Sequence, residues 1–400
     1  MRTAKLLNPN IITLIVTHFL WGFVNYVYAI QIQPYLLSIY GTTPEAVQIL
    51  GTILTIGSLS AVIPLLLGFL ADLHGRKRLI VIGELISLLG LIGLSFGNSM
   101  VWLSIISIFI FNLGIGFYDS PLQGLIHESA LEKRGLAYSI VYNSSSIAGI
   151  IASFIIQNEM LNGEFIIYFQ ISCVLFAFAI LINFIVLRDR VQNKDHISFP
   201  FVQIFKKPLS RLTAIAFFID TFSWGLPLSI ANGIYIILFG VDVVFIAALS
   251  LILNIVLVLF QYPAGSAVDR FGRLFGLIMG EVTGIIWIIL TLISIAISQA
   301  ELLILAYAML GVSVAFWRPS VILSFIEIDP TAVSTNFGIL SFIQRLGGIP
   351  TAVVAGFLFP LIGFSPLLIV TFIGTLIAIT LFFKINRLEK SPVTKTTTIQ

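Results

Sequence analysis

Long apolar runs separated by short polar turns dominate the pattern of this chain. Each run has about 20 residues, the length that an α-helix needs to cross a hydrocarbon core about 30 Å thick. A helix satisfies its own backbone hydrogen bonds in lipid, and no alternating pattern suggests a membrane barrel. The pattern predicts twelve membrane-spanning helices, at about 11–38, 45–70, 78–97, 99–126, 136–157, 165–187, 211–239, 243–264, 274–297, 301–325, 335–360 and 366–384.

One long polar segment interrupts the series after the sixth predicted span. It separates a six-helix bundle at residues 1–190 from a second six-helix bundle at residues 211–400, which ends in a short polar tail. We interpret residues 191–210 as a cytoplasmic linker. Internal duplication of this kind is a recurrent transporter architecture, with the substrate held near the membrane midplane where the repeats meet.

Composition agrees with this pattern. The chain is 58% hydrophobic and only 10% charged, with a mean hydropathy of +1.08, so its surface would carry too few charges for a soluble globule. We therefore predict an all-α integral membrane protein. Its single cysteine, Cys173, excludes intramolecular disulfides and any multi-cysteine metal site, and we expect no cofactor.

The basic residues indicate the orientation. Of the 21 Lys and Arg residues, 19 fall in the termini and loops of one side, and the other two, Arg318 and Arg345, lie within predicted spans. The positive-inside rule makes that side cytoplasmic, so both termini of a multi-pass plasma-membrane protein are expected inside the cell. The net charge of +3 then has a topological cause, and no nucleic-acid partner is needed to explain it. The first apolar run is longer than that of a signal peptide, and we expect it to be retained.

A repeated loop motif relates the two halves. The first copy reads Gly68-Phe-Leu-Ala-Asp72-Leu-His-Gly75-Arg76-Lys77-Arg78, and the second reads Gly265-Ser-Ala-Val-Asp269-Arg-Phe-Gly272-Arg273. Their matched residues are separated by the same 269 − 72 = 197 positions. The same separation relates Gly83-Glu84 to Gly280-Glu281. We infer two pseudo-symmetric six-helix bundles.

The first copy resembles the loop between the second and third spans of the major facilitator superfamily, Gly-x-Leu-Ala-Asp-x-x-Gly-Arg-Lys. The second copy is degenerate and has Leu274 in place of the lysine. The resemblance implies a transporter that works by alternating access, in which the Asp and Arg of the loop form a latch that closes the cytoplasmic side. It assigns the latch to Gly68, Asp72, Gly75, Arg76 and Lys77 and, by the repeat, to Asp269, Gly272 and Arg273.

Glu128 and Glu327, which end the fourth and tenth spans, are the expected acidic partners of the two latch arginines. The alternative is that the latch residues are surface charges that contribute less than about 1 kcal/mol each. The resemblance places Glu84 and Glu281 in peripheral spans, where a structural role is favoured over transport chemistry.

Polar residues within the spans indicate a substrate and proton pathway. An ionisable side chain at the centre of a membrane helix costs about 2.5 to 3.5 kcal/mol, so such residues are functional candidates by default. The resemblance implies a cavity lined by spans 1, 4, 7 and 10 with help from spans 2, 5, 8 and 11. The candidates on these spans are His18, Asn25, Asn112, Asp119, Tyr142, Asp220, Trp224, Asn254, Arg318 and Arg345. Trp224 opens Trp-Gly-Leu-Pro227, which predicts a helix kink.

The four charged candidates have distinct expected roles. Asp119 is expected to pair with Arg318, and Asp220 to carry the coupling proton. Arg345 is expected to bind an anionic group of the substrate or to release the proton from the acid. The alternative is that the two acids and two arginines form neutral structural pairs.

The sequence thus predicts a monomeric secondary transporter of a small organic solute, coupled to protons and embedded in the lipid bilayer. An uncoupled facilitator and a hydrophobic-compound exporter remain alternatives. Drug exporters of this family carry an arginine where this chain has Asn112 and a proline motif in span 5 that is missing here, so drug antiport is disfavoured. A transporter-like receptor would be expected to carry a large extra-membrane domain. A lipid-modifying enzyme is disfavoured because the four histidines form no metal-ligand spacing.

The charge asymmetry yields a test of topology. In a Cys173→Ser background, single cysteines at Thr43 and Asn162 should react with an impermeant maleimide added to intact cells, whereas a cysteine at Asn193 should react only after permeabilisation. Labelling of Asn193→Cys in intact cells would reverse the predicted orientation.

Overall fold

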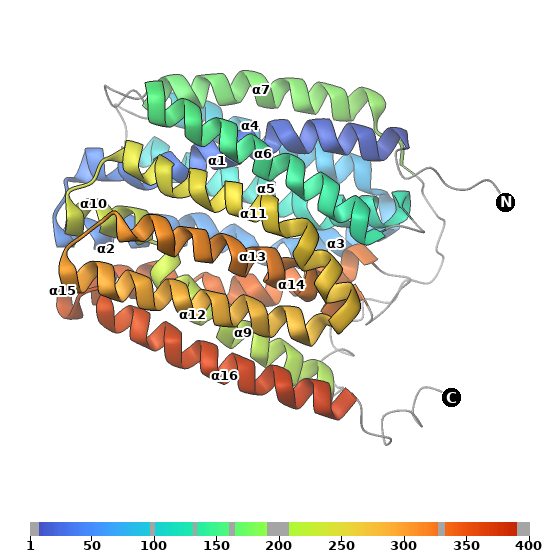
Figure 1. The fold of residues 1–400 in the computed structure, drawn as a ribbon. Coiled ribbons are helices and arrows are strands. Elements are labelled where there is room, and N and C mark those ends of the chain that lie inside the picture. Colours follow the sequence, from blue (N-terminus) through green and yellow to red (C-terminus); the bar gives the residue numbers. More distant parts are fainter. Residues whose placement is uncertain are drawn as a thin grey trace.

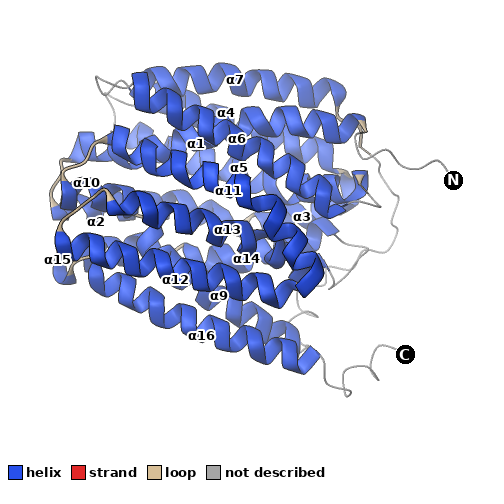
Figure 2. Cartoon of the chain, in the orientation of Figure 1, coloured by secondary structure: helices blue, strands red, loops and turns tan. Residues whose placement is uncertain are grey.

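The computed structural model describes residues 8–96, 101–130, 134–159, 165–189, 208–326 and 333–389. Within these ranges the regular structure is entirely helical, joined by short turns (Figure 2). The first half of the chain forms α1 (Pro9–Tyr40), α2 (Pro44–Ser58), the 3₁₀ helix η1 (Leu59–Val62), α3 (Pro64–His74), α4 (Arg76–Ser95), α5 (Val101–Ser129), α6 (Arg134–Glu159) and α7 (Phe165–Val186).

The second half repeats this series. It forms α9 (Pro208–Leu228), α10 (Ala231–Phe239), α11 (Val243–Phe271), α12 (Arg273–Ile297), α13 (Leu302–Ile326), α14 (Val333–Gly348), α15 (Thr351–Ile362) and α16 (Ser365–Glu389). In the described ranges, 11 helices or helix pairs are long and apolar enough to cross a membrane. The remaining predicted span is divided among α2, η1 and α3. The prediction of an all-helical, multi-pass membrane protein is confirmed, and most of the predicted linker lies outside the described residues.

Three spans are broken at a proline. Pro64 begins α3 after the 3₁₀ turn, Pro227 lies one residue before α9 ends, and Pro350 precedes α15. Proline has no N–H to donate and its ring crowds the preceding turn, so a continuous helix is interrupted there. At Pro227 the predicted kink is therefore a full break between α9 and α10.

The helices run side by side, and α1 begins at the same end of the bundle where α16 ends (Figure 1). We call this the charged end, because the loop from α3 to α4 places Arg76, Lys77 and Arg78 there. The helices α2, α10 and α15 lie at the opposite end. Large apolar side chains on the outer helices are exposed, as a surface facing hydrocarbon requires; examples are Trp102, Phe184 and Leu361.

The two halves touch through glycines at both ends of the bundle. At the charged end, a Cβ atom on Gly68 of α3 would overlap the carbonyl of Ser334 on α14. At the opposite end, a Cβ atom on Gly51 of α2 would overlap the carbonyl of Ala352 on α15. In membranes, where helices gain little from hydrophobic burial, such small residues allow the close backbone contact that holds helices together. The two halves are thus in close backbone contact at both ends of the bundle.

The repeated motif offers a matched pair of glycines to test this contact. Gly68→Ala should separate α3 from α14 and cost about 1 to 3 kcal/mol of folding free energy, because the added methyl meets backbone that cannot rotate away. Gly265→Ala, at the equivalent motif position, should be tolerated, because the nearest atom lies 4.0 Å from the added methyl. Thermal unfolding of the two purified variants is the measurement, and equal stability would contradict the proposed contact.

Candidate transport site and latch

Asp72 joins the two halves at the charged end. Its Oδ2 accepts hydrogen bonds from the backbone N–H and the hydroxyl of Thr335, both at 2.8 Å. Thr335 lies in the first turn of α14, where backbone N–H groups lack partners within the helix and the helix dipole favours an anion. The Asp72 side chain is only 1% exposed. A carboxylate of the first half therefore caps a helix of the second.

Arg76 completes this latch. Its guanidinium forms ion pairs with Asp72, at 2.7 Å, and with Glu128 of α5, the acidic partner expected from the sequence. Its Nε also donates to the Ser334 hydroxyl of α14 at 2.7 Å. The arginine thus serves as a planar fork that binds two carboxylates and one hydroxyl. Ser334 and Thr335 are latch residues that the sequence alone did not reveal.

The turn between α3 and α4 positions these groups. Gly75 has a φ of 98°, a conformation that side chains with a Cβ rarely adopt, so α3 can end and α4 begin at the next residue. The backbone N–H of Lys77 donates to Asp189 at 3.1 Å, and the Lys77 ammonium lies 5.8 Å from the ring centre of Phe184. Lys77 is therefore fixed to the first half and does not bridge the halves through these contacts.

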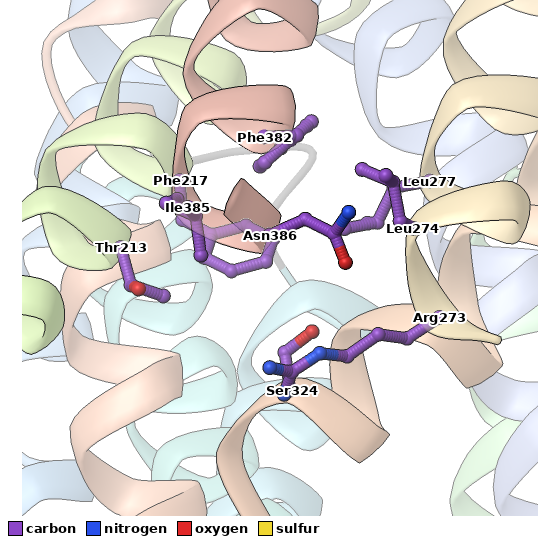
Figure 3. Close-up of a pocket in the computed structure, with 9 residues that line it drawn as sticks. All are labelled: Thr213, Phe217, Arg273, Leu274, Leu277, Ser324, Phe382, Ile385 and Asn386. Carbon is purple, nitrogen blue, oxygen red and sulfur yellow. The ribbon is translucent and has the colours of Figure 1, made fainter. Parts of the chain in front are cut away.

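The second motif copy keeps the turn but not the buried acid. Gly272 has a φ of 88°, whereas Asp269 is exposed. The Arg273 side chain extends toward Ser324 and lines a cavity of about 30 Å³, room for about two water molecules (Figure 3). Glu327, its expected partner, lies outside the described residues. The equivalence expected from the motif repeat therefore does not extend to the surroundings of Asp269.

An ion pair lies between the halves farther along the same helices. Arg345 of α14 contacts Asp119 of α5 at 2.9 Å, and each side chain is 26% exposed. The expected pairing of Asp119 with Arg318 is wrong. Helix depth alone suggested Arg318, but the contact depends on which faces of α5, α13 and α14 meet, and that is a property of the packing.

Arg318 instead lies over an aromatic ring. Its guanidinium carbon is 5.4 Å from the ring centre of Tyr142. His18 contacts the edge of the same ring, with centres 5.3 Å apart. His18 also stacks on Trp21, and its Nδ1 lies 3.0 Å from the hydroxyl of Tyr118. These residues come from α1, α5, α6 and α13, so one cation faces an aromatic cluster where the two halves meet.

Asp220 is almost fully buried, at 1% exposure. Its Oδ2 accepts a hydrogen bond from the indole of Trp317 at 3.1 Å. The indole of Trp224, another candidate, donates a hydrogen bond to Glu281 of α12 at 2.9 Å. Sequence reasoning missed the part played by Glu281 and Trp317. The repeated Gly-Glu pair was the available signal, but it did not indicate the neighbouring acid.

The asparagine candidates make mostly local contacts. Asn112 donates to the carbonyl of Ile108 at 2.9 Å and to the hydroxyl of Tyr28 at 3.3 Å. Asn254 donates to the carbonyl of Ser250 at 2.9 Å and lies against Gly149 of the first half. Asn25 is half-buried on α1. Asn254 thus contributes to the contact of α6 with α11.

A helical membrane protein with two related halves, and with polar and charged side chains that meet at their interface, has the features of a membrane transporter. The sequence model of the Major Facilitator Superfamily matches residues 14–225. The chain belongs to this family of transporters.

Solved structures share the fold. The human organic anion transporter MFSD10 (TETRAN) superposes with a TM-score of 0.72 at 13% identity, over 94% of this chain and 99% of that one. A mutant of the nucleoside transporter NupG gives 0.70 at 16% identity, over 94% and 100%. A POT family transporter in complex with 5-aminolevulinic acid gives 0.70 at 13% identity, over 94% and 95%.

One similar curated protein is the Agnestins efflux protein AgnL12 of Paecilomyces divaricatus. It is 30% identical over 84 residues, which make up 21% of this chain. The match covers 19% of that relative's length.

The latch contacts predict a shift in the conformational equilibrium. In Asp72→Ala, the ratio of molecules with α3 and α14 separated to molecules with them in contact should rise at least about tenfold. Hydrogen bonds to a charged group contribute about 1.5 to 3 kcal/mol each, and 1.4 kcal/mol changes an equilibrium constant tenfold. Spin labels at His74 and Arg387, both exposed at this end, should report a longer distance. Asp269→Ala is the matched control and should leave the distance unchanged, since Asp269 is exposed; an unchanged distance in Asp72→Ala would remove the latch.

Proposed function

We propose that this protein is a proton-coupled secondary transporter that moves a small organic solute by alternating access. Both termini lie in the cytoplasm and the protein acts as a monomer in the plasma membrane. An uncoupled facilitator and a hydrophobic-compound exporter are the alternatives. The short match to an efflux protein favours export, and we adopt that direction as part of the proposal.

One observation carries this proposal: at each end of the bundle, hydrogen bonds to the first turn of a second-half helix lie among the contacts that join the halves. Asp72 holds the first turn of α14, and Thr55 of α2 similarly accepts a hydrogen bond from the backbone N–H of Val353, in the first turn of α15, at 3.0 Å. Each half thus meets the other at helix ends that water can hydrate when the contact opens. Such contacts can break at one end while the other remains closed, which alternating access requires.

The enclosed side chains support an organic substrate with an anionic group and a flat apolar part. Arg318 contacts the Tyr142 ring, and in the described residues it forms no ion pair with a carboxylate. Asp119 already pairs with Arg345, so we assign the anionic group of the substrate to Arg318 rather than to Arg345. The near-parallel rings of His18 and Trp21 supply an apolar wall for the rest of the molecule.

A ligand-stabilisation screen tests the proposed function. The purified protein is heated with organic anions, nucleosides, 5-aminolevulinic acid and hydrophobic cations, the first three being those named for the structural neighbours. A compound that raises the unfolding temperature of the protein but not of Arg318→Ala is then tested for counterflow in liposomes. Stabilisation without counterflow would favour a receptor, and counterflow without response to a pH gradient would favour a facilitator.

The buried acid of α9 yields a prediction for coupling. Asp220→Asn should abolish accumulation driven by a pH gradient yet retain counterflow of the same compound, because the amide keeps the hydrogen bond from Trp317 but cannot take up a proton. Asp242→Asn, a change at the exposed N-cap of α11, is the control and should retain both activities. Full accumulation in Asp220→Asn would exclude Asp220 as the coupling residue.

A further inference from the structure

A second acid faces Asp220. Glu281 of α12 is 1% exposed, as is Asp220, and the two carboxyl groups lie within hydrogen-bonding reach of one another. A hydrogen bond between two carboxyl groups requires a proton on one of them, because two carboxylates offer only acceptors. Two carboxylates in contact would also repel each other strongly in an apolar interior. A hydrogen bond between these two side chains therefore requires one bound proton.

Two tryptophans donate hydrogen bonds to this pair, one to each acid. Trp317 of α13 donates to Asp220, and Trp224 of α9 donates to Glu281. The remaining oxygens, Oδ1 of Asp220 and Oε1 of Glu281, are buried and have no hydrogen-bond donor in the described structure. Those two oxygens are the ones available for a shared proton. The neutral indoles orient the acids without supplying a countercharge.

Glycines make the room for this arrangement. A Cβ atom on Gly280 would come within 2.9 Å of the Cβ atom of Trp317, and one on Gly284 would overlap the ring of Trp224. Both glycines flank Glu281 on α12, one residue before it and three after it. The two indoles can therefore approach this glutamate closely only because positions 280 and 284 are glycines.

No cation neutralises the pair: in the described ranges, neither carboxyl group forms an ion pair. The charged groups on the packed helices are directed elsewhere or lie at the charged end. Arg318 of α13 contacts Tyr142, and Arg345 of α14 contacts Asp119. The others are Arg211 of α9, Asp269 and Arg270 of α11, Arg273 of α12, and Lys384 and Arg387 of α16, which belong to the ends of their helices at the charged end.

The equivalent glutamate of the first half has a different partner. Glu84 accepts a hydrogen bond from the side-chain amide of Asn183 at 2.6 Å, and both residues are fully buried. An amide can serve a carboxyl group in this way whether or not the glutamate gains a proton elsewhere. The repeat thus places one glutamate beside an amide and the other beside a second acid, which provides an internal control.

We propose that Asp220 and Glu281 form a single proton-binding site, in which the two carboxyl groups share one proton and bind a second one taken up from water. The first state carries one negative charge and the second carries none. Trp317 directly precedes Arg318 in α13, so one helix carries both a hydrogen-bond donor to this site and the cation that faces Tyr142. The coupling role of this site rests on the proposed function; the shared proton does not.

Infrared spectroscopy of the purified full-length protein tests the shared proton, with the proton itself as the ligand. Aspartate and glutamate are isotope-labelled in separate preparations, and the carbonyl band of protonated carboxyl groups is followed over a pH titration. In the unaltered protein, a labelled-aspartate band and a labelled-glutamate band should change together in the same two steps, because strongly interacting groups titrate as a pair. Independent single steps would overturn the proposal without any variant.

The variants sharpen this test. Glu281→Gln should leave Asp220 with a single step whose midpoint is displaced by about one pH unit or more, and Asp220→Asn should do the same for Glu281. Glu84→Gln, the matched control, should keep both steps of the pair. An unchanged Asp220 midpoint in Glu281→Gln would overturn the shared site. If the pair titrates jointly but no compound is driven by a pH gradient, the proton site stands and the coupling assigned under the proposed function fails.

Discussion

The contact of the Asp72 carboxylate with the first turn of α14 is the interaction on which the closed charged end depends. Both oxygens are used, one by Thr335 and the other by Arg76, and the group is shielded from water. Removing one partner of such a buried pair costs about 3 to 5 kcal/mol, because the other charge is left uncompensated. The hydrogen bonds of Asp72 are strong while water is excluded from them, and water can hydrogen-bond to the same groups once α3 and α14 separate. A latch with these properties can hold one conformation without preventing the other.

Lipid imposes the constraint that organises the remaining polar groups. A charge in hydrocarbon is tolerated only where it meets a partner or lines an enclosed site, and the described charges follow this rule. Asp119 meets Arg345, Arg318 meets an aromatic ring, and Asp220 meets Glu281 and an indole. These three arrangements differ in charge. An ion pair is neutral, a cation over an aromatic ring keeps its charge, and two paired carboxyl groups hold a proton. Together they provide the separate groups that substrate binding and proton coupling would each need.

The duplicated sequence has diverged in use. Asp72 is buried between the halves whereas Asp269 is exposed. Gly68 contacts backbone, whereas the nearest atom to a Cβ on Gly265 would be a side-chain oxygen 4.0 Å away. In the interior, the equivalent glutamates differ in their neighbours. Glu281 lies beside a second acid, Asp220, whereas Glu84 accepts a hydrogen bond from the amide of Asn183. The first motif copy is built into a buried contact between the halves, and the carboxyl pair lies within the second half.

The sequence by itself determined the spans and the duplication and singled out Asp72 and Arg76 as candidates, because hydropathy is local and the motif is contiguous. It also identified Asp119, Asp220, Arg318 and Arg345, since a charge in an apolar run is visible without any contact. Their partners were decided only by the tertiary structure. Which faces of α5, α13 and α14 meet selects Arg345 over Arg318 for Asp119, and the approach of α9 to α12 brings Asp220 to Glu281, 61 positions away. Depth along a helix can be counted from the chain, but the rotation of one helix against another follows from how all their side chains pack.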